Sequence, residues 1–214
     1  MPYGTRCYAP CGGRPHRGAA LSQSEQKSYR FGIGIEVPTD SAVSNGVLNA
    51  SPIGGGDPGH TFEYVRDPDG KIVSLMSFGP AGRIRTAEEF TAFQNGQTAG
   101  TAKYPVSGTI STWETNISDA QAKQAIQINA SLRSSPPNYT KDIQCTGLAL
   151  NVAQRIGVNL PSGVGPVVIR VPDARFLGVV NKTVWSGSVA NPYHLSRQMT
   201  QMFGPPHVRT ADDF

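Results

Sequence analysis

Hydrophobic and polar residues alternate with a period of two in several short stretches of the chain. Residues 29–37 combine large apolar side chains with glycines, and residues 61–66 and 71–78 flank a turn at residues 67–70 that contains Pro68 and Gly70. Two alternating stretches around such a turn are typical of a β-hairpin. Further stretches with strand character are residues 104–115 and 167–171. The pattern therefore predicts five strands, two of them paired in a hairpin.

Other stretches repeat apolar residues every three or four positions, as amphipathic helices do. One begins at Cys145 and ends at Gly157, and another follows Ser118 and Gln121, which have the spacing of a capping box. Additional helices are expected at residues 86–93, 173–180 and 192–203, and the residues after Gly204 are expected to fray. Because strands and helices both recur, the fold class is predicted to be α+β.

The composition agrees with one turn-rich domain. The chain has 214 residues, 24 of them Gly and 17 Pro, and only 16% of its residues are charged. A chain of this length can bury a core in a single domain without disulfides or metals. Residues 1–25 show no hydrophobic period and are expected to form a flexible N-terminal arm, which leaves residues 26–214 as a single catalytic domain.

The formal net charge of +4 favours a polyanionic partner such as a cell wall, phospholipid head groups or nucleic acid. No run of basic residues is dense enough to choose among these partners. We find neither a signal-peptide-like apolar run nor 18 consecutive apolar residues. The protein is therefore expected to be soluble, and any export should use a route without a cleaved leader.

Three cysteines are present, an odd number. Cys7 and Cys11 could form a disulfide, bind a metal together with His16, or stay reduced. If Cys7 and Cys11 pair, Cys145 is the leftover thiol. For the candidate catalytic site we expect neither a metal nor a cofactor.

Cys145 is the strongest candidate for chemistry. At the start of a helix its sulfur would lie near unsatisfied N–H groups, which bias a thiol toward thiolate. His60, near the start of a predicted strand, would supply the base that a cysteine nucleophile needs. The alternative is that both residues are structural, since free cysteine is among the most buried residue types.

A family resemblance favours the catalytic interpretation. The chain resembles the circularly permuted NlpC/P60 papain-like thiol hydrolases, in particular the branch found in antibacterial toxins and type VI secretion effectors. The resemblance covers roughly residues 58–161, about half the chain. In the permuted branch the histidine precedes the cysteine, as it does here. The stretches that carry the resemblance are Gly59-His60-Thr61-Phe62, Ser77-Phe78-Gly79-Pro80, Asn138-Tyr139, Gln144-Cys145-Thr146 and Gly157-Val158-Asn159-Leu160-Pro161.

The resemblance implies a permuted papain-like fold in which an antiparallel sheet packs against helices and Cys145 begins a helix. It gives His60 the role of base and Cys145 that of nucleophile. A third polar residue should orient the histidine: Ser77 is one candidate, and a backbone carbonyl or a bound water is the alternative. Ser77 lies beside His60 only if the hairpin register slips by one residue. Gln144 would either contribute to the oxyanion site or face solvent.

The implied function is cleavage of amide bonds in peptidoglycan stem peptides by a secreted antibacterial effector. Such an effector would be made in the bacterial cytoplasm, delivered by secretion machinery to the periplasm of a target cell, and inhibited by a cognate immunity protein. Nucleic acid is not an expected partner. Two alternatives are a lipid acyl hydrolase or acyltransferase similar to the lecithin:retinol acyltransferases, and a non-catalytic secreted binding module.

Overall fold

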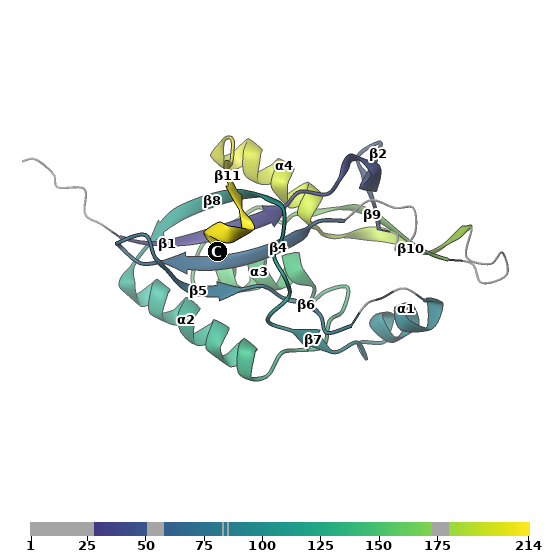
Figure 1. The fold of residues 1–214 in the computed structure, drawn as a ribbon, viewed down its shortest axis with the longest axis horizontal. Helices are drawn as coiled ribbons and strands as arrows, with labels where there is room; N and C mark the ends of the chain where they lie inside the picture. Colours follow the sequence, from purple (N-terminus) through teal and green to yellow (C-terminus); the bar gives the residue numbers. More distant parts are fainter. Residues whose placement is uncertain (1–27, 51–57, 83, 85, 173–179) are drawn as a thin grey trace, which may run out of the picture.

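The computed structural model describes residues 28–50, 58–82, 84, 86–172 and 180–214. These residues form four α-helices and mainly antiparallel sheets, which confirms the α+β class. The largest sheet has the strand order β11-β8-β1-β4-β5, and all of its pairings are antiparallel (Figure 1). Its strands are β1 (Tyr29–Glu36), β4 (His60–Arg66), β5 (Ile72–Met76), β8 (Thr109–Ile117) and β11 (His207–Thr210).

Three helices pack on one face of this sheet and form the main core. They are α2 (Asp119–Ser134), α3 (Cys145–Arg155) and α4 (Pro192–Phe203). The capping box expected for α2 is present, since Ser118 and Gln121 bond each other's backbone N–H groups. The helix expected at Cys145 is confirmed, and Gly157 follows its end with a positive φ of 76°.

The rest of the described structure consists of a smaller sheet and several short elements. The strand order of the second sheet is β10-β9-β3-β2, antiparallel except where β3 pairs with β9. Its strands are β2 (Val43–Ser44), β3 (Val47–Ala50), β9 (Val164–Pro172) and β10 (Asn181–Ala190). The remaining elements are α1 (Ala87–Gln94), β6 (Gly79–Pro80), β7 (Gly100–Thr101) and the 3₁₀ turns Asp40–Ala42 and Ala211–Asp213.

The glycines of β1 leave room for two aromatic rings. Tyr64 lies over Gly32 and Phe62 lies over Gly34, where an added Cβ would come within 2.2 Å of a ring carbon. The end of the sequence covers this second face of the sheet, because Phe214 packs edge-on against both rings. The expectation that the residues after Gly204 fray is therefore wrong.

The β4–β5 hairpin contains a bulge that sets the geometry of the site. Asp67 donates its N–H to the Lys71 carbonyl at 2.9 Å, and Gly70 takes a φ of +89° in the turn. The register then shifts by one residue between Arg66, which pairs with Ile72, and Val65, which pairs with Ser74. A bulge turns every later side chain to the opposite face. Ser77 thereby comes to the same face as His60.

Some expectations are corrected and others fall outside the described residues. The strand expected at residues 104–115 begins only at Thr109, and the strand β10 was not predicted. The N-terminal arm at residues 1–25 lies outside the described residues, and so does almost all of the helix expected at residues 173–180.

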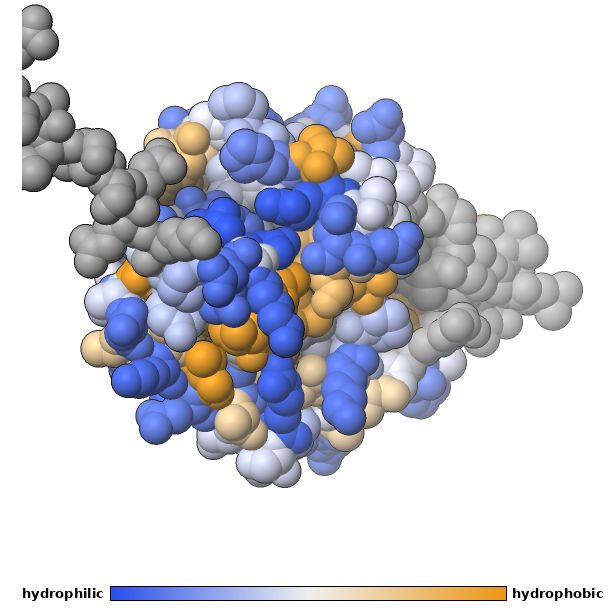
Figure 2. Space-filling view, turned by 60° about the vertical axis from the view of Figure 1, so that its left-hand side comes forward, coloured by the Kyte–Doolittle hydropathy of each residue, from blue (hydrophilic) through white to orange (hydrophobic). Residues whose placement is uncertain are grey.

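Hydrophilic side chains cover most of the face seen in Figure 2, with hydrophobic side chains in small groups between them. None of the helices in the described part of the chain is long and apolar enough to cross a membrane.

Candidate active site

Cys145 occupies the first position of α3, where Gln144 caps the helix. Gln144 Oε1 accepts the Thr146 N–H at 2.7 Å and lies 3.4 Å from the Cys145 sulfur. Its amide Nε2 donates to the Ala190 carbonyl at 2.5 Å, which ties the helix start to the end of β10. Gln144 is absent from the lining of the cavity described below. The structure thus places Gln144, which is buried, in the helix cap; the alternative in which it faces solvent is wrong, and an oxyanion role stays a prediction.

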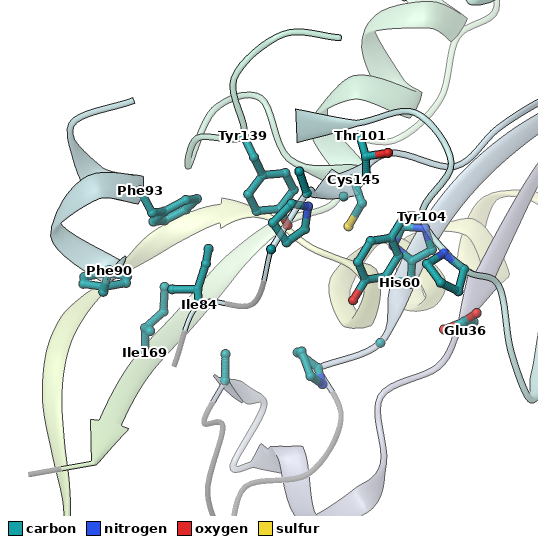
Figure 3. A pocket seen from close by; sticks show the side chains of 18 of the residues that line it. Glu36, His60, Ile84, Phe90, Phe93, Thr101, Tyr104, Tyr139, Cys145 and Ile169 are labelled. Atoms are coloured by element: carbon teal, nitrogen blue, oxygen red, sulfur yellow. The ribbon is translucent and has the colours of Figure 1, made fainter. Parts of the chain in front are cut away.

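A buried hydrogen bond joins the strand that carries His60 to the helix that carries Cys145. The hydroxyls of Thr61 and Thr146 lie 3.0 Å apart, and both side chains are fully buried. Each threonine directly follows a candidate catalytic residue. His60 and Cys145 consequently line the same open cavity of about 1110 Å³, and Figure 3 shows them close together at one end of it.

His60 is held by a chain of hydrogen bonds. Its Nε2 lies 2.8 Å from Ser77 Oγ, and the Ser77 hydroxyl donates its only hydrogen to the Tyr104 carbonyl at 2.7 Å. Ser77 must therefore accept the bond from His60, which places the ring proton on Nε2. The unprotonated Nδ1 of neutral His60 is left to accept a proton. Of the candidates from the sequence analysis, the structure places Ser77 against the imidazole, and the Tyr104 carbonyl contacts Ser77, not the histidine.

The expectation that Cys145 rests as a thiolate is wrong, because its thiol pKa is raised instead of lowered. Cys145 is 7% exposed, and burial raises the pKa of its thiol, although nearby groups oppose the rise, chiefly the backbone of Thr61 and the hydroxyl of Thr146. His60 is 4% exposed, and burial lowers its pKa to about 4. Desolvation penalises both charged forms. At neutral pH the pair therefore rests as a neutral thiol and a neutral imidazole.

Tyr139 is a site residue to which the sequence analysis gave no role. It lines the cavity, and its hydroxyl interacts with both the backbone N–H and the sulfur of Cys145. Burial, followed by the charge of a Cys145 thiolate, raises the pKa of Tyr139 well above its usual value, so its hydroxyl keeps its proton. The only signal in the sequence was the pair Asn138-Tyr139 within the family resemblance.

Away from the sulfur, the cavity wall is largely apolar. Figure 3 shows Ile84, Phe90, Phe93 and Ile169 grouped at the opposite end from His60, with Tyr139 between. Phe90 and Phe93 come from α1 and pack in one cluster with Val171 of β9. Polar groups also line the cavity, among them Glu36, Lys103 and Arg170. A substrate reaching Cys145 would thus meet both an apolar wall and charged side chains.

The described residues contain no candidate metal site. Nowhere among them do three or more His, Cys, Asp or Glu side chains lie close enough together to hold a metal ion. The arrangement Cys7, Cys11 and His16 lies outside the described residues. The chemistry available around Cys145 is that of its thiol, its imidazole neighbour and nearby hydroxyl groups.

Comparisons of the chain with protein-family models, with curated proteins and with solved structures found no match.

Proposed function

We propose that the protein is a cysteine hydrolase in which Cys145 is the nucleophile and His60 the base. The observation that supports this most is the fixed orientation of His60, whose Nε2–H bonds Ser77 while the ring lines the same cavity as the Cys145 sulfur. Because any buried histidine needs a hydrogen-bond partner, it is the combination of this orientation with a cavity shared with Cys145 that favours a catalytic role. Nucleophile, base and orienting group are the parts that thiol catalysis requires.

The proposed reaction begins from neutral groups. As the sulfur attacks a carbonyl carbon, its proton passes to His60 Nδ1, and the imidazolium that forms is stabilised through its Nε2–H bond to Ser77. The Tyr139 hydroxyl, which interacts with the sulfur, and the Cys145 N–H at the start of α3 are the proposed donors to the developing oxyanion. His60 then protonates the leaving group, and water, deprotonated by the same ring, hydrolyses the thioester.

The order of these parts along the chain supports a permuted papain-like fold. The histidine lies on β4, and the cysteine lies 85 residues later at the start of α3, which packs against β4. An antiparallel sheet and a nucleophile at a helix N-terminus are the features that the family resemblance implies. We include the NlpC/P60 assignment in the proposal on this basis.

The first proposed substrate is an amide bond of a peptidoglycan stem peptide. The resemblance and the net charge of +4 support it, since the cell wall is anionic. We extend the proposal to an antibacterial effector that is delivered by secretion machinery, acts in the periplasm of a target cell and is inhibited by a cognate immunity protein.

A second candidate is a lipid acyl hydrolase or acyltransferase. The apolar wall formed by Phe90, Phe93 and Ile169 favours it, because an acyl chain could lie along this wall while its ester carbonyl reaches Cys145. The same pair of residues would attack an ester or an amide by the same steps.

Parallel assays of the full chain distinguish the two candidates. Incubation with purified peptidoglycan is expected to release soluble fragments with new amino termini, identified by mass spectrometry, while phospholipid vesicles of mixed acyl composition should release no fatty acid. Release of fatty acid alone would replace the first candidate with the second. An intact wall and intact lipid together would contradict both substrate classes.

A further inference from the structure

We propose that Tyr104 is the positioning residue for His60: its ring shields the imidazole from water, and its peptide fixes which ring nitrogen of His60 carries the proton. The inference rests on the proposed function, in which His60 is the base. Tyr104 lies in the segment between β7 and β8, outside both elements that carry the candidate catalytic pair.

The ring of Tyr104 covers the imidazole. The centroids of the two rings lie 4.9 Å apart with planes inclined by 43°, and Figure 3 shows Tyr104 beside His60 in the pocket. Tyr104 is itself 36% exposed, whereas His60 is 4% exposed. The tyrosine therefore stands between the imidazole and solvent, and its ring contributes to the burial that disfavours a charged His60.

The backbone of Tyr104 fixes Ser77 from two sides. Its N–H donates to the Ser77 carbonyl at 2.9 Å, and its own carbonyl accepts the Ser77 hydroxyl at 2.7 Å. With that hydroxyl hydrogen engaged, Ser77 can only accept from His60 Nε2. The tautomer with the proton on Nε2 is thus set by the peptide of Tyr104 acting through Ser77.

Gly79 makes this arrangement possible. The Tyr104 ring lies against Gly79, where an added Cβ would come within 2.1 Å of a ring carbon. The backbone at Gly79 does not have a positive φ, so alanine is compatible with its conformation. A Gly79→Ala substitution should displace the tyrosine ring while leaving Tyr104 chemically unchanged.

The test follows the ring nitrogens of His60 by ¹H–¹⁵N NMR over pH 3–9, with the His60→Gln spectrum providing the assignment. In the wild type we expect the Nε2–H tautomer and a pKa near 4. Tyr104→Ala and Gly79→Ala should both move the pKa toward its usual 6.5 while keeping the Nε2–H tautomer, because the Tyr104 carbonyl that accepts from Ser77 remains. Tyr104→Phe should keep the wild-type values, and so should Gly82→Ala, whose new Cβ meets nothing within 4 Å.

A His60 pKa that stays near its wild-type value in both Tyr104→Ala and Gly79→Ala, with native circular dichroism, would overturn the proposal. If Tyr104→Ala does not fold, the same titration of His60 in Gly79→Ala and Tyr104→Leu replaces it as the test. The acid limb of kcat/KM should follow the ring pKa in each variant. Because the NMR titration needs no substrate, it decides the role of Tyr104 even if the hydrolase assignment fails.

Discussion

Replacing Cys145 with alanine is expected to abolish hydrolysis, with kcat falling roughly 10⁴- to 10⁶-fold, as in enzymes that lose their nucleophile. The loss should be complete in practice because no other described residue near His60 carries a thiol, and the reaction would have to proceed by direct attack of water. The measurement is release of product from whichever substrate the parallel assays identify. Protein folding is checked by thermal melting, since a buried thiol also contributes to packing.

The matched control is the double variant Cys7→Ser/Cys11→Ser, which removes the other two thiols of the sequence and should retain wild-type kcat. A second pair of variants isolates the base: His60→Gln should lower kcat about 10²- to 10⁴-fold, whereas His207→Gln, on the exposed part of β11, should not. Persistent activity in Cys145→Ala would remove the proposed nucleophile.

The second large effect concerns Glu63, which has no place in the catalytic proposal. It points from β4 into the helix-covered side of the sheet and is completely buried. Neither of its carboxyl oxygens makes a hydrogen bond of good geometry, although the Asn129 side chain on α2 lies near enough to interact with it, and Oδ1 of the buried Asn129 lacks a partner as well. Burial raises the pKa of Glu63 to about 8, although the Asn129 side chain and the Arg133 charge oppose the rise.

The folded protein therefore binds a proton at Glu63 that the unfolded chain releases above its usual pKa of 4.5. Stability is greatest below that value and falls by about 1.4 kcal/mol for each pH unit as the pH rises to the folded pKa near 8. Glu63→Gln is neutral in both states, and its amide group can donate to Asn129 Oδ1. We expect the free energy of unfolding of Glu63→Gln to exceed that of the wild type by about 3 kcal/mol at pH 7.

Urea unfolding of both proteins at pH 5, 6, 7 and 8 checks this expectation. The difference in free energy of unfolding between the two proteins should grow with pH across this whole range, because it levels off only above the folded pKa near 8, while any contribution from His60 cancels. Glu88→Gln, exposed on α1, is the control and should change stability by less than about 0.5 kcal/mol at every pH. A constant difference between Glu63→Gln and the wild type would show that Glu63 is ionised in the folded protein.

Much of the fold follows from local sequence signals. The turn at residues 67–70, the capping box at Ser118 and the helix beginning at Cys145 each depend on neighbouring residues, and all three are present in the structure. The helix expected at residues 192–203 matches α4 residue for residue. The fraying expected after Gly204 was wrong because β11 pairs with β8, almost 100 residues earlier, and local sequence does not encode such a distant pairing.

The site itself depends on non-local geometry. Ser77 lies on the same face as His60 only because of the bulge in β5. The sequence analysis allowed two registers for the β4–β5 hairpin and could not choose between them. Tyr104 was assigned to a strand, yet it lies before β8 and covers the imidazole, a contact that no periodicity reveals. The position of Cys145 at a helix N-terminus predicted a lowered thiol pKa, but burial raises that pKa instead. The burial comes from elements that are distant in the sequence, so local sequence does not predict it.

The central claim is that Cys145 and His60 act as one nucleophile–base pair, and an acylation experiment tests it without knowledge of the natural substrate. The full chain is mixed with p-nitrophenyl acetate at pH 7, p-nitrophenolate release is followed by absorbance, and the acetylated peptide is identified by mass spectrometry. We predict a burst of about one equivalent with the acetyl group on Cys145, absent in Cys145→Ala and slowed about 10²-fold in His60→Gln. Acetylation of Cys145 at the same rate in His60→Gln as in the wild type would contradict the pair.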